Sequence, residues 1–271
     1  QSLEGKINLV DGFKNPPEIS FGLLNKEMGH AAFESIKRAV RDLKDGKIDV
    51  LVPPPINKEA IHSQEFQFMG HTDYIDSEIS GNSTMMMVSS DLRLALLTEH
   101  IPVSRVTDSI THNVVKNKVE ALNQTLIRDF LIEQPKIAIL SIDPHVGDGG
   151  VISDNDKKLI VPAINKLQDF GVLVYGPFSA DSFFGSSEYK KYDLIIAAYH
   201  DQGLIPFKTL SFGMGVNYTS GLDRIRTSPD HGTAYSIAGK GVASNDSFLC
   251  SIHLAIDIYQ RRKIYDEKLK S

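Results

Sequence analysis

Cysteine is almost absent from this chain of 271 residues, which contains Cys250 alone. A single cysteine excludes an intramolecular disulfide and any zinc site built from several cysteines. It fits a reducing compartment, and we therefore expect a cytoplasmic protein. Long apolar runs are missing as well, since no stretch approaches the roughly 18 residues that a membrane-spanning helix needs. We expect no contact with a membrane.

An excess of positive charge is also missing. Lysine and arginine number 29 against 34 aspartates and glutamates, so the formal net charge is -5 and the pI is near 6.0. This balance does not favour a nucleic-acid partner. Three sequence motifs are absent too: the Gly-x-Gly-x-x-Gly of Rossmann nucleotide sites, the Walker A sequence of P-loops and the Gly-x-Ser-x-Gly of many serine hydrolases.

Ordinary globular composition is present, with 41% apolar and 23% charged residues. The length suits one large domain or two modest ones. Apolar periodicity predicts helices over residues 28–44, 113–132, 153–170 and 246–262, and strands over residues 49–52, 85–88, 137–142, 172–175 and 194–199. Residues 92–97 favour a further strand, with a helix as the alternative. This alternation predicts an α/β fold with a largely parallel or mixed sheet.

Histidines follow three of the predicted strands. Ligands of open α/β sheets bind beyond the carboxyl ends of the strands, and His100, His145 and His200 all lie at such ends. A fourth, His71, lies in a polar segment that we expect to be a loop. Three imidazoles with an open coordination position suit a catalytic divalent metal. The alternative is three unrelated loop histidines, because the spacing between them is wide.

Basic and small residues follow in the last quarter of the chain. Lys208, Asn217 and Arg226 suit an anionic substrate, because arginine offers a fork for carboxylate or phosphate and lysine a point charge; the alternative is ordinary surface charge. The segment from Asp230 to Gly241 is rich in small residues, which allow a ligand to approach the backbone closely. A plain turn is the alternative there.

Six segments, taken in order, carry a resemblance. They are GHTDY (70–74), DPHVGDGG (143–150), YHDQG (199–203), GMGVN (213–217), IRTS (225–228) and DHGTA (230–234). On these motifs the chain resembles the 4-hydroxythreonine-4-phosphate dehydrogenase family, which acts in pyridoxal 5'-phosphate biosynthesis. The resemblance extends from about Gly46 to the C-terminus.

The resemblance implies two α/β/α domains with a cleft between them, similar in fold to isocitrate and isopropylmalate dehydrogenases. We expect residues 1–70 with 228–271 to form the first domain, and residues 71–227 the second, which would also carry the dimer interface. The implied assembly is a homodimer whose subunits share each active site. The family begins with a motif rich in glycine and proline that does not occur here, and we expect one N-terminal βαβ unit to be missing.

The resemblance also implies roles for single residues. The implied metal ligands are His100, His145 and His200, one of them supplied by the neighbouring subunit. The implied substrate contacts are His71, Thr72, Lys208, Asn217 and Arg226. The implied catalytic residues are Lys208 and Asp181. The implied nucleotide contacts are His231, Gly232, Thr233 and Ala234.

The implied reaction is the oxidation of 4-phosphooxy-L-threonine by NAD or NADP, with loss of CO2 to give 3-amino-2-oxopropyl phosphate. The divalent metal is open among zinc, cobalt, nickel, manganese and magnesium. Two alternatives stay open. One is a related dehydrogenase for 4-phosphoerythronate or 4-phosphothreonate. The other is a ligand-binding protein without catalytic activity.

Overall fold

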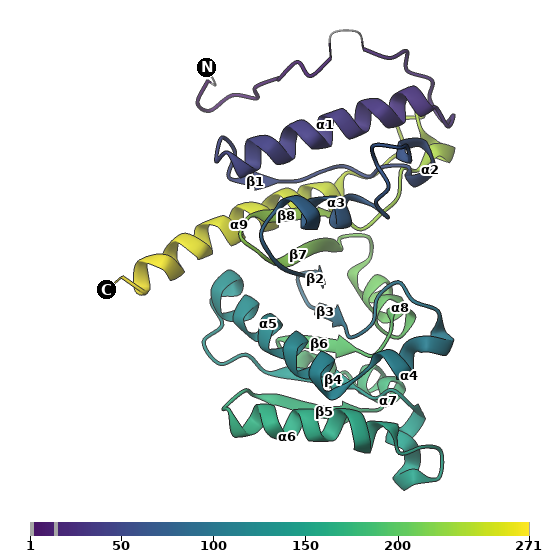
Figure 1. Ribbon diagram of the computed structural model, residues 1–271, viewed down its shortest axis with the longest axis vertical. Helices are drawn as coiled ribbons and strands as arrows, with labels where there is room; N and C mark the ends of the chain where they lie inside the picture. The colour runs from purple at the N-terminus through teal and green to yellow at the C-terminus, as the bar shows by residue number, and fades with distance from the viewer. Residues whose placement is uncertain (1–2, 14–15, 271) are drawn as a thin grey trace.

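A computed structural model describes residues 3–13 and 16–270. In this part of the chain eight strands form one mixed sheet in the order β1-β8-β7-β2-β3-β6-β4-β5, stacked along the long axis of the molecule (Figure 1). The strands are β1 (Val50–Leu51), β2 (Gly81–Val88), β3 (Arg93–Leu96), β4 (Ile137–Leu140), β5 (Val174–Phe178), β6 (Leu194–Ala197), β7 (Val216–Leu222) and β8 (Ile225–Pro229). The mixed α/β class expected from the sequence is confirmed.

Nine α-helices occur among the described residues. They are α1 (Lys26–Lys44), α2 (Lys58–Ile61), α3 (His71–Glu78), α4 (Val106–Ser109), α5 (His112–Phe130), α6 (Val161–Asp169), α7 (Ala180–Gly185), α8 (His200–Ser211) and α9 (Asp246–Lys268). None of them combines the length and apolar character that crossing a membrane requires.

The strand directions divide the sheet into two parts. Strands β3, β6, β4 and β5 run parallel to one another, and β1 runs parallel to β8. Strand β2 is antiparallel to both β3 and β7, and β7 is antiparallel to β8. The carboxyl ends of β3, β6 and β4 therefore lie on one edge of the sheet. The expected domain division at residues 70 and 228 stays a prediction, and the sheet is continuous across it.

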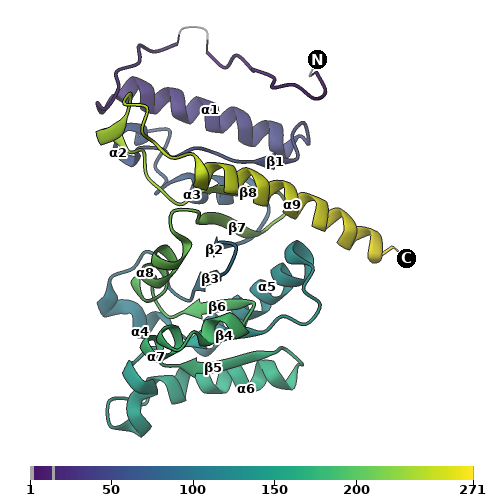
Figure 2. The same ribbon diagram turned by 180° about the vertical axis from the view of Figure 1, so that it is seen from behind.

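Helices cover both faces of the sheet. On one face α5, α6 and α9 pack over a large core that includes Val119, Leu122 and Ile139. On the other face α7 and α8 pack against Leu94 and Ile195, and Figure 2 shows α8 and α7 from that side. A third core joins α1, α2 and α3 around a group of aromatic rings.

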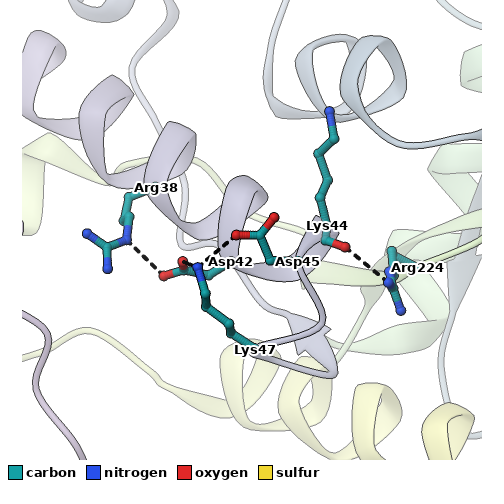
Figure 3. Close-up of polar contacts among 6 residues, drawn as sticks. All are labelled: Arg38, Asp42, Lys44, Asp45, Lys47 and Arg224. Carbon is teal, nitrogen blue, oxygen red and sulfur yellow. Dashed lines mark hydrogen bonds and ion pairs between the residues drawn. The ribbon is translucent and has the colours of Figure 1, made fainter. Parts of the chain in front are cut away.

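The end of α1 is tied to the turn between β7 and β8 (Figure 3). Arg224 Nη2 donates to the carbonyl of Lys44 at 3.2 Å, which satisfies one of the free carbonyls at the helix end. Nearby, Asp42 accepts from Arg38 at 2.9 Å, and this hydrogen bond lowers the pKa of the Asp42 carboxyl. The contact from Arg224 places the end of α1 beside β7 and β8, two of the strands that form the floor of the cavity described below.

The expectation for His71 is wrong. His71 does not lie in a polar loop: it is the first residue of α3 and is buried. Helix α9 buries Ser247, Ser251, Ala255, Ile258 and Arg262, whereas its apolar residues Leu249 and Ile256 are exposed. Small side chains let α9 approach β7 and β8 closely, with Thr227 Oγ1 donating to the Ser251 carbonyl at 2.8 Å.

Candidate active site

A cavity of about 340 Å³ lies between α8, α3 and the face of the sheet. Side chains from β2, β7 and β8 form its floor, and α8 forms one wall. Nine of the residues that the sequence nominated line this cavity: His71, Thr72, His100, His200, Lys208, Asn217, Arg226, His231 and Gly232. The structure therefore brings most of the predicted site together.

The floor follows from strand alternation. Successive side chains of a strand point to opposite faces, so residues two apart share a face. Asn217 of β7 is opposite Ser228 of β8, and Thr219 is opposite Arg226. Asn217, Arg226 and Ser228 all line the cavity. Tyr218, which lies between them on β7, is buried against the opposite helical layer.

The wall follows from helical spacing. His200, Leu204 and Lys208 are four residues apart on α8, so they lie on one face of the helix, and all three line the cavity. Gly203 allows the opposite side of α8 to sit close to the sheet. A Cβ at Gly203 would lie 2.8 Å from Leu94 Cδ2, nearer than real Cβ atoms approach.

His100 and His200 meet where β3 and β6 end. These strands are parallel neighbours, and the two ring centroids are 5.8 Å apart. His200 Nδ1 lies 2.7 Å from Asp201 Oδ1. A carboxylate at Nδ1 favours the tautomer with the proton on that nitrogen, which leaves the Nε2 lone pair for a ligand such as a metal. The pair thus has the donor chemistry of part of a metal site.

The third predicted metal ligand, His145, is not part of this cavity, and neither is Asp181. The two lie near each other, since His145 contributes to a lowered pKa of the Asp181 carboxyl, for which the hydrogen bond from Ser179 is the main cause. Within residues 3–13 and 16–270, no three side chains of histidine, cysteine, aspartate or glutamate form a metal-binding group. One chain therefore does not assemble the three histidines, and a ligand from a neighbouring subunit stays a prediction.

A left-handed turn over Pro144–Gly150 presents His145. Its residues from His145 to Gly149 all have positive φ. Asp156 holds the start of the turn, since its carboxylate accepts the backbone N–H of Ile142 at 2.8 Å and of Asp143 at 3.2 Å. The Asp143 side chain in turn accepts from Asn155 at 2.8 Å and from Ser153. The Asp143 carboxylate thus has two side-chain donors.

Arg226 is the most unusual side chain of the cavity. It is only 3% exposed, and among the described residues no carboxylate forms an ion pair with it. Nη1 donates to Thr219 Oγ1 at 3.0 Å and lies 3.4 Å from Thr72 Oγ1, and Nε has no partner. Burial lowers the pKa of Arg226 to about 10, so the guanidinium is still charged at neutral pH. A buried charge without a counter-charge indicates a site for an anion.

His71 faces the same space. It is 9% exposed, and its Nε2 also lacks a hydrogen-bond partner in the described part of the chain. Its pKa is lowered to about 3, mainly by burial and secondly by the positive charge of Arg226. The imidazole is therefore neutral at physiological pH and can donate or accept a single hydrogen bond to a ligand.

The candidate nucleotide segment is divided. His231 and Gly232 line the cavity, whereas Thr233 and Ala234 do not. Sequence reasoning missed three charged residues at the cavity: Lys58, Asp73 and Asp230. The sequence could have indicated Asp230 as a site residue, because it directly precedes His231 in a matched motif. Nothing in the sequence indicated Lys58, which resembles an ordinary charged residue after a run of prolines.

The fold and the cavity together define an α/β protein with a pocket for a small anion next to a pair of histidines. A family model described as pyridoxal phosphate biosynthetic protein PdxA matches residues 2–255. The chain belongs to this family, which confirms the resemblance seen in the sequence.

Individual relatives agree. The chain is 44% identical over 260 residues to a 4-hydroxythreonine-4-phosphate dehydrogenase of Bacteroides thetaiotaomicron. The aligned region covers 95% of this chain and 71% of that protein. It is 38% identical to a D-threonate 4-phosphate dehydrogenase of Cupriavidus necator, over 95% of this chain and 78% of that protein. A solved 4-hydroxythreonine-4-phosphate dehydrogenase of Klebsiella pneumoniae superposes with a TM-score of 0.76 at 33% identity, over 88% and 72% of the two chains. A Methylococcus capsulatus isocitrate dehydrogenase, at 10% identity and TM-score 0.51, shares the fold.

Proposed function

We propose that this chain is a metal-dependent, NAD(P)-linked dehydrogenase. It oxidises 4-phosphooxy-L-threonine and releases CO2 to give 3-amino-2-oxopropyl phosphate, in pyridoxal 5'-phosphate biosynthesis. The observation that carries the proposal is the buried Arg226, which has no carboxylate partner and lies in one cavity with His100 and His200. The Bacteroides relative, at 44% identity, supports the choice of substrate.

The phosphate end of the substrate belongs at Arg226. A guanidinium binds phosphate with two parallel hydrogen bonds, and a dianion restores the missing counter-charge. Thr72 and Asn217 lie within 3.5 Å of Arg226 Nη1, so their side chains can complete the shell around the same ligand. His71 adds one neutral hydrogen-bonding nitrogen on this side.

The reacting end belongs at His100 and His200. These imidazoles fit two positions of a three-histidine site, and in the proposed homodimer the partner subunit's His145 is the third, with Asp181 beside it. These residues would hold a divalent ion, drawn from zinc, cobalt, nickel, manganese or magnesium, and the ion would supply Lewis acidity toward the substrate hydroxyl. Lys208, on the same face of α8 as His200, is the residue that we assign to proton transfer at that hydroxyl.

The nicotinamide cofactor, NAD or NADP, belongs on the His231 side. His231 and Gly232 border the cavity, and Thr233 and Ala234 continue into the exposed loop that would contact the rest of the nucleotide. A nicotinamide cofactor held by these residues would supply the hydride acceptor. The cytoplasmic location expected from the single cysteine stays a prediction.

A second candidate substrate comes from the Cupriavidus relative, whose name specifies D-threonate 4-phosphate. That compound keeps the phosphate and the acid and differs at the amino group. An assay that follows nicotinamide reduction separates the two functions when it offers 4-phosphooxy-L-threonine, 4-phosphothreonate and 4-phosphoerythronate in turn, each with NAD+ and with NADP+. Preference for 4-phosphooxy-L-threonine supports the first function. Preference for either phosphorylated sugar acid supports the second, and no reduction with any of them supports a non-catalytic binding protein.

A further inference from the structure

Asp230 forms an ion pair with Lys208 inside the cavity. Lys208 is in the last turn of α8, and Asp230 directly follows β8. Lys208 Nζ and Asp230 Oδ1 are 3.2 Å apart, and the aspartate side chain is 18% exposed against 55% for the lysine. A mostly buried carboxylate thus faces a more exposed ammonium at the wall of the candidate active site.

Contacts from two other segments hold Asp230. Its backbone N–H donates to Ser247 Oγ of α9 at 3.1 Å, and that hydroxyl donates to the Gly215 carbonyl at 2.7 Å. A Cβ at Gly215 would lie 3.2 Å from Asp230 Oδ2 and 2.7 Å from Phe207 Cε1. The absence of a side chain at Gly215 therefore leaves the room that the Asp230 carboxylate occupies.

The two central cations of the cavity differ in their partners. Arg226 has no carboxylate partner among the described residues, whereas Lys208 is paired. A ligand phosphate therefore gains most at Arg226, because the Lys208 charge is already compensated. Lys208 shares its helix face with His200 and Leu204. Its ammonium therefore faces the same cavity as His200, about two helical turns further along α8, and its charge is compensated by Asp230.

We propose that Asp230 is a positioning residue that holds the Lys208 ammonium at one place in the cavity. The proposal rests on the proposed function of this cavity and extends it. A lysine side chain has four rotatable carbon–carbon bonds and needs a fixed partner to keep its amine at one place. Small displacements of a group that transfers a proton cost large factors in rate.

A double-mutant cycle tests the proposal in the full chain. We expect Asp230→Asn to lower kcat by about tenfold or more and to leave KM for the phosphorylated substrate within about threefold. In a Lys208→Gln background the same change has little further effect, because the residue that Asp230 positions is gone. Glu188→Gln is the matched control: Glu188 pairs with Lys191 at 2.6 Å on the exposed surface, away from the cavity, and its loss leaves kcat unchanged.

Binding of inorganic phosphate, measured by calorimetry, gives a second cycle that needs no turnover. Removal of the Asp230 charge frees the Lys208 ammonium, so Asp230→Asn binds phosphate about threefold more tightly, and Lys208→Gln abolishes this gain. If the wild-type chain binds phosphate but reduces no cofactor with any substrate, the proposed function fails. The phosphate-binding cycle then still shows whether Asp230 and Lys208 are coupled. Additive effects of Asp230→Asn and Lys208→Gln would overturn the positioning role. The role is also overturned if Lys208→Gln loses as much phosphate affinity as Arg226→Lys does.

Discussion

His71 and Arg226 face the same cavity, and each keeps a buried side-chain nitrogen for which the described residues offer no hydrogen-bond partner. Both groups are costly to bury in this state, because an unsatisfied donor or acceptor loses its bonds to water. A bound anion can satisfy both. The cavity is therefore expected to bind an anion.

Phosphate should stabilise the chain through Arg226. We expect inorganic phosphate to raise the midpoint of thermal unfolding, since it binds the folded state alone. Arg226→Lys should weaken phosphate affinity about tenfold or more, because lysine lacks the planar fork. Arg224→Lys is the control: Arg224 is two residues away, is half-buried outside the cavity and donates to the Lys44 carbonyl. An unchanged response in Arg226→Lys would contradict the assignment.

Protonation of His71 should weaken the fold in acid. Its pKa is about 3 in the folded chain against the ordinary 6.5. Between these values the unfolded chain binds a proton that the folded chain does not, so stability is complete above pH 6.5 and falls as the pH falls toward 3. The slope for one proton is about 1.4 kcal/mol per pH unit. Urea unfolding across this range should show a shallower acid loss for His71→Asn, and parallel curves for the two proteins would refute the prediction.

A buried ion pair joins α5 to α9 and should matter far more than a surface pair. Arg262 Nε donates to Asp129 Oδ1 at 2.6 Å, and Tyr218 Oη donates to Asp129 Oδ2 at 2.5 Å. Asp129→Ala leaves a buried guanidinium unpaired and should cost about 3–5 kcal/mol in the free energy of unfolding. Asp257→Ala removes the exposed partner of Arg261 on the same helix and should cost less than about 1 kcal/mol. Denaturant unfolding of both variants measures the difference, and equal costs would show that the buried pair has no special role.

The left-handed turn that carries His145 should tolerate alanine at one glycine and not at another. Gly147 and Gly149 both have positive φ, which costs an L-residue about 1–2 kcal/mol. A Cβ at Gly147 would also lie 2.2 Å from the Ser153 carbonyl oxygen, whereas Gly149 faces open space. Gly147→Ala should therefore be the more destabilising of the two in thermal unfolding. Equal shifts would mean that the turn relaxes without cost.

Loss of His200 should remove metal binding while the fold persists. Three-ligand sites tolerate the loss of a ligand poorly, and the His200 side chain lines the cavity without joining the core. Equilibrium dialysis with zinc or manganese, together with circular dichroism, checks both parts for His200→Ala. Wild-type metal affinity in that variant would remove His200 from the site.

The long amphipathic elements could be predicted from the sequence, and the elements around the cavity could not. Helix α8 escaped prediction because Gly203 and Pro206 both disfavour a helix interior. The structure shows why Gly203 is there: a Cβ would press on Leu94 and Ala197. Strands β7 and β8 were read as substrate-binding segments, since polar residues such as Asn217 and Arg226 interrupt their apolar pattern. These residues face the cavity. The apolar alternation that predicts strands does not detect a strand whose buried face is polar.

The resemblance nominated His100, His200 and Arg226, and these three residues line one cavity. Asp230 was not nominated although a matched motif contains it, because its partner Lys208 lies 22 positions earlier on another element. Only the folded chain brings the two together. The same limit applies to His145, whose strand end lies on the expected edge of the sheet but outside the cavity of its own chain.

The most direct test of the account is nicotinamide reduction by the wild-type chain with 4-phosphooxy-L-threonine, measured before and after removal of divalent metal by a chelator. The account predicts reduction that stops with the chelator and returns when zinc, cobalt or manganese is restored. Absence of reduction with every phosphorylated acid, in a preparation that still binds phosphate, would contradict it.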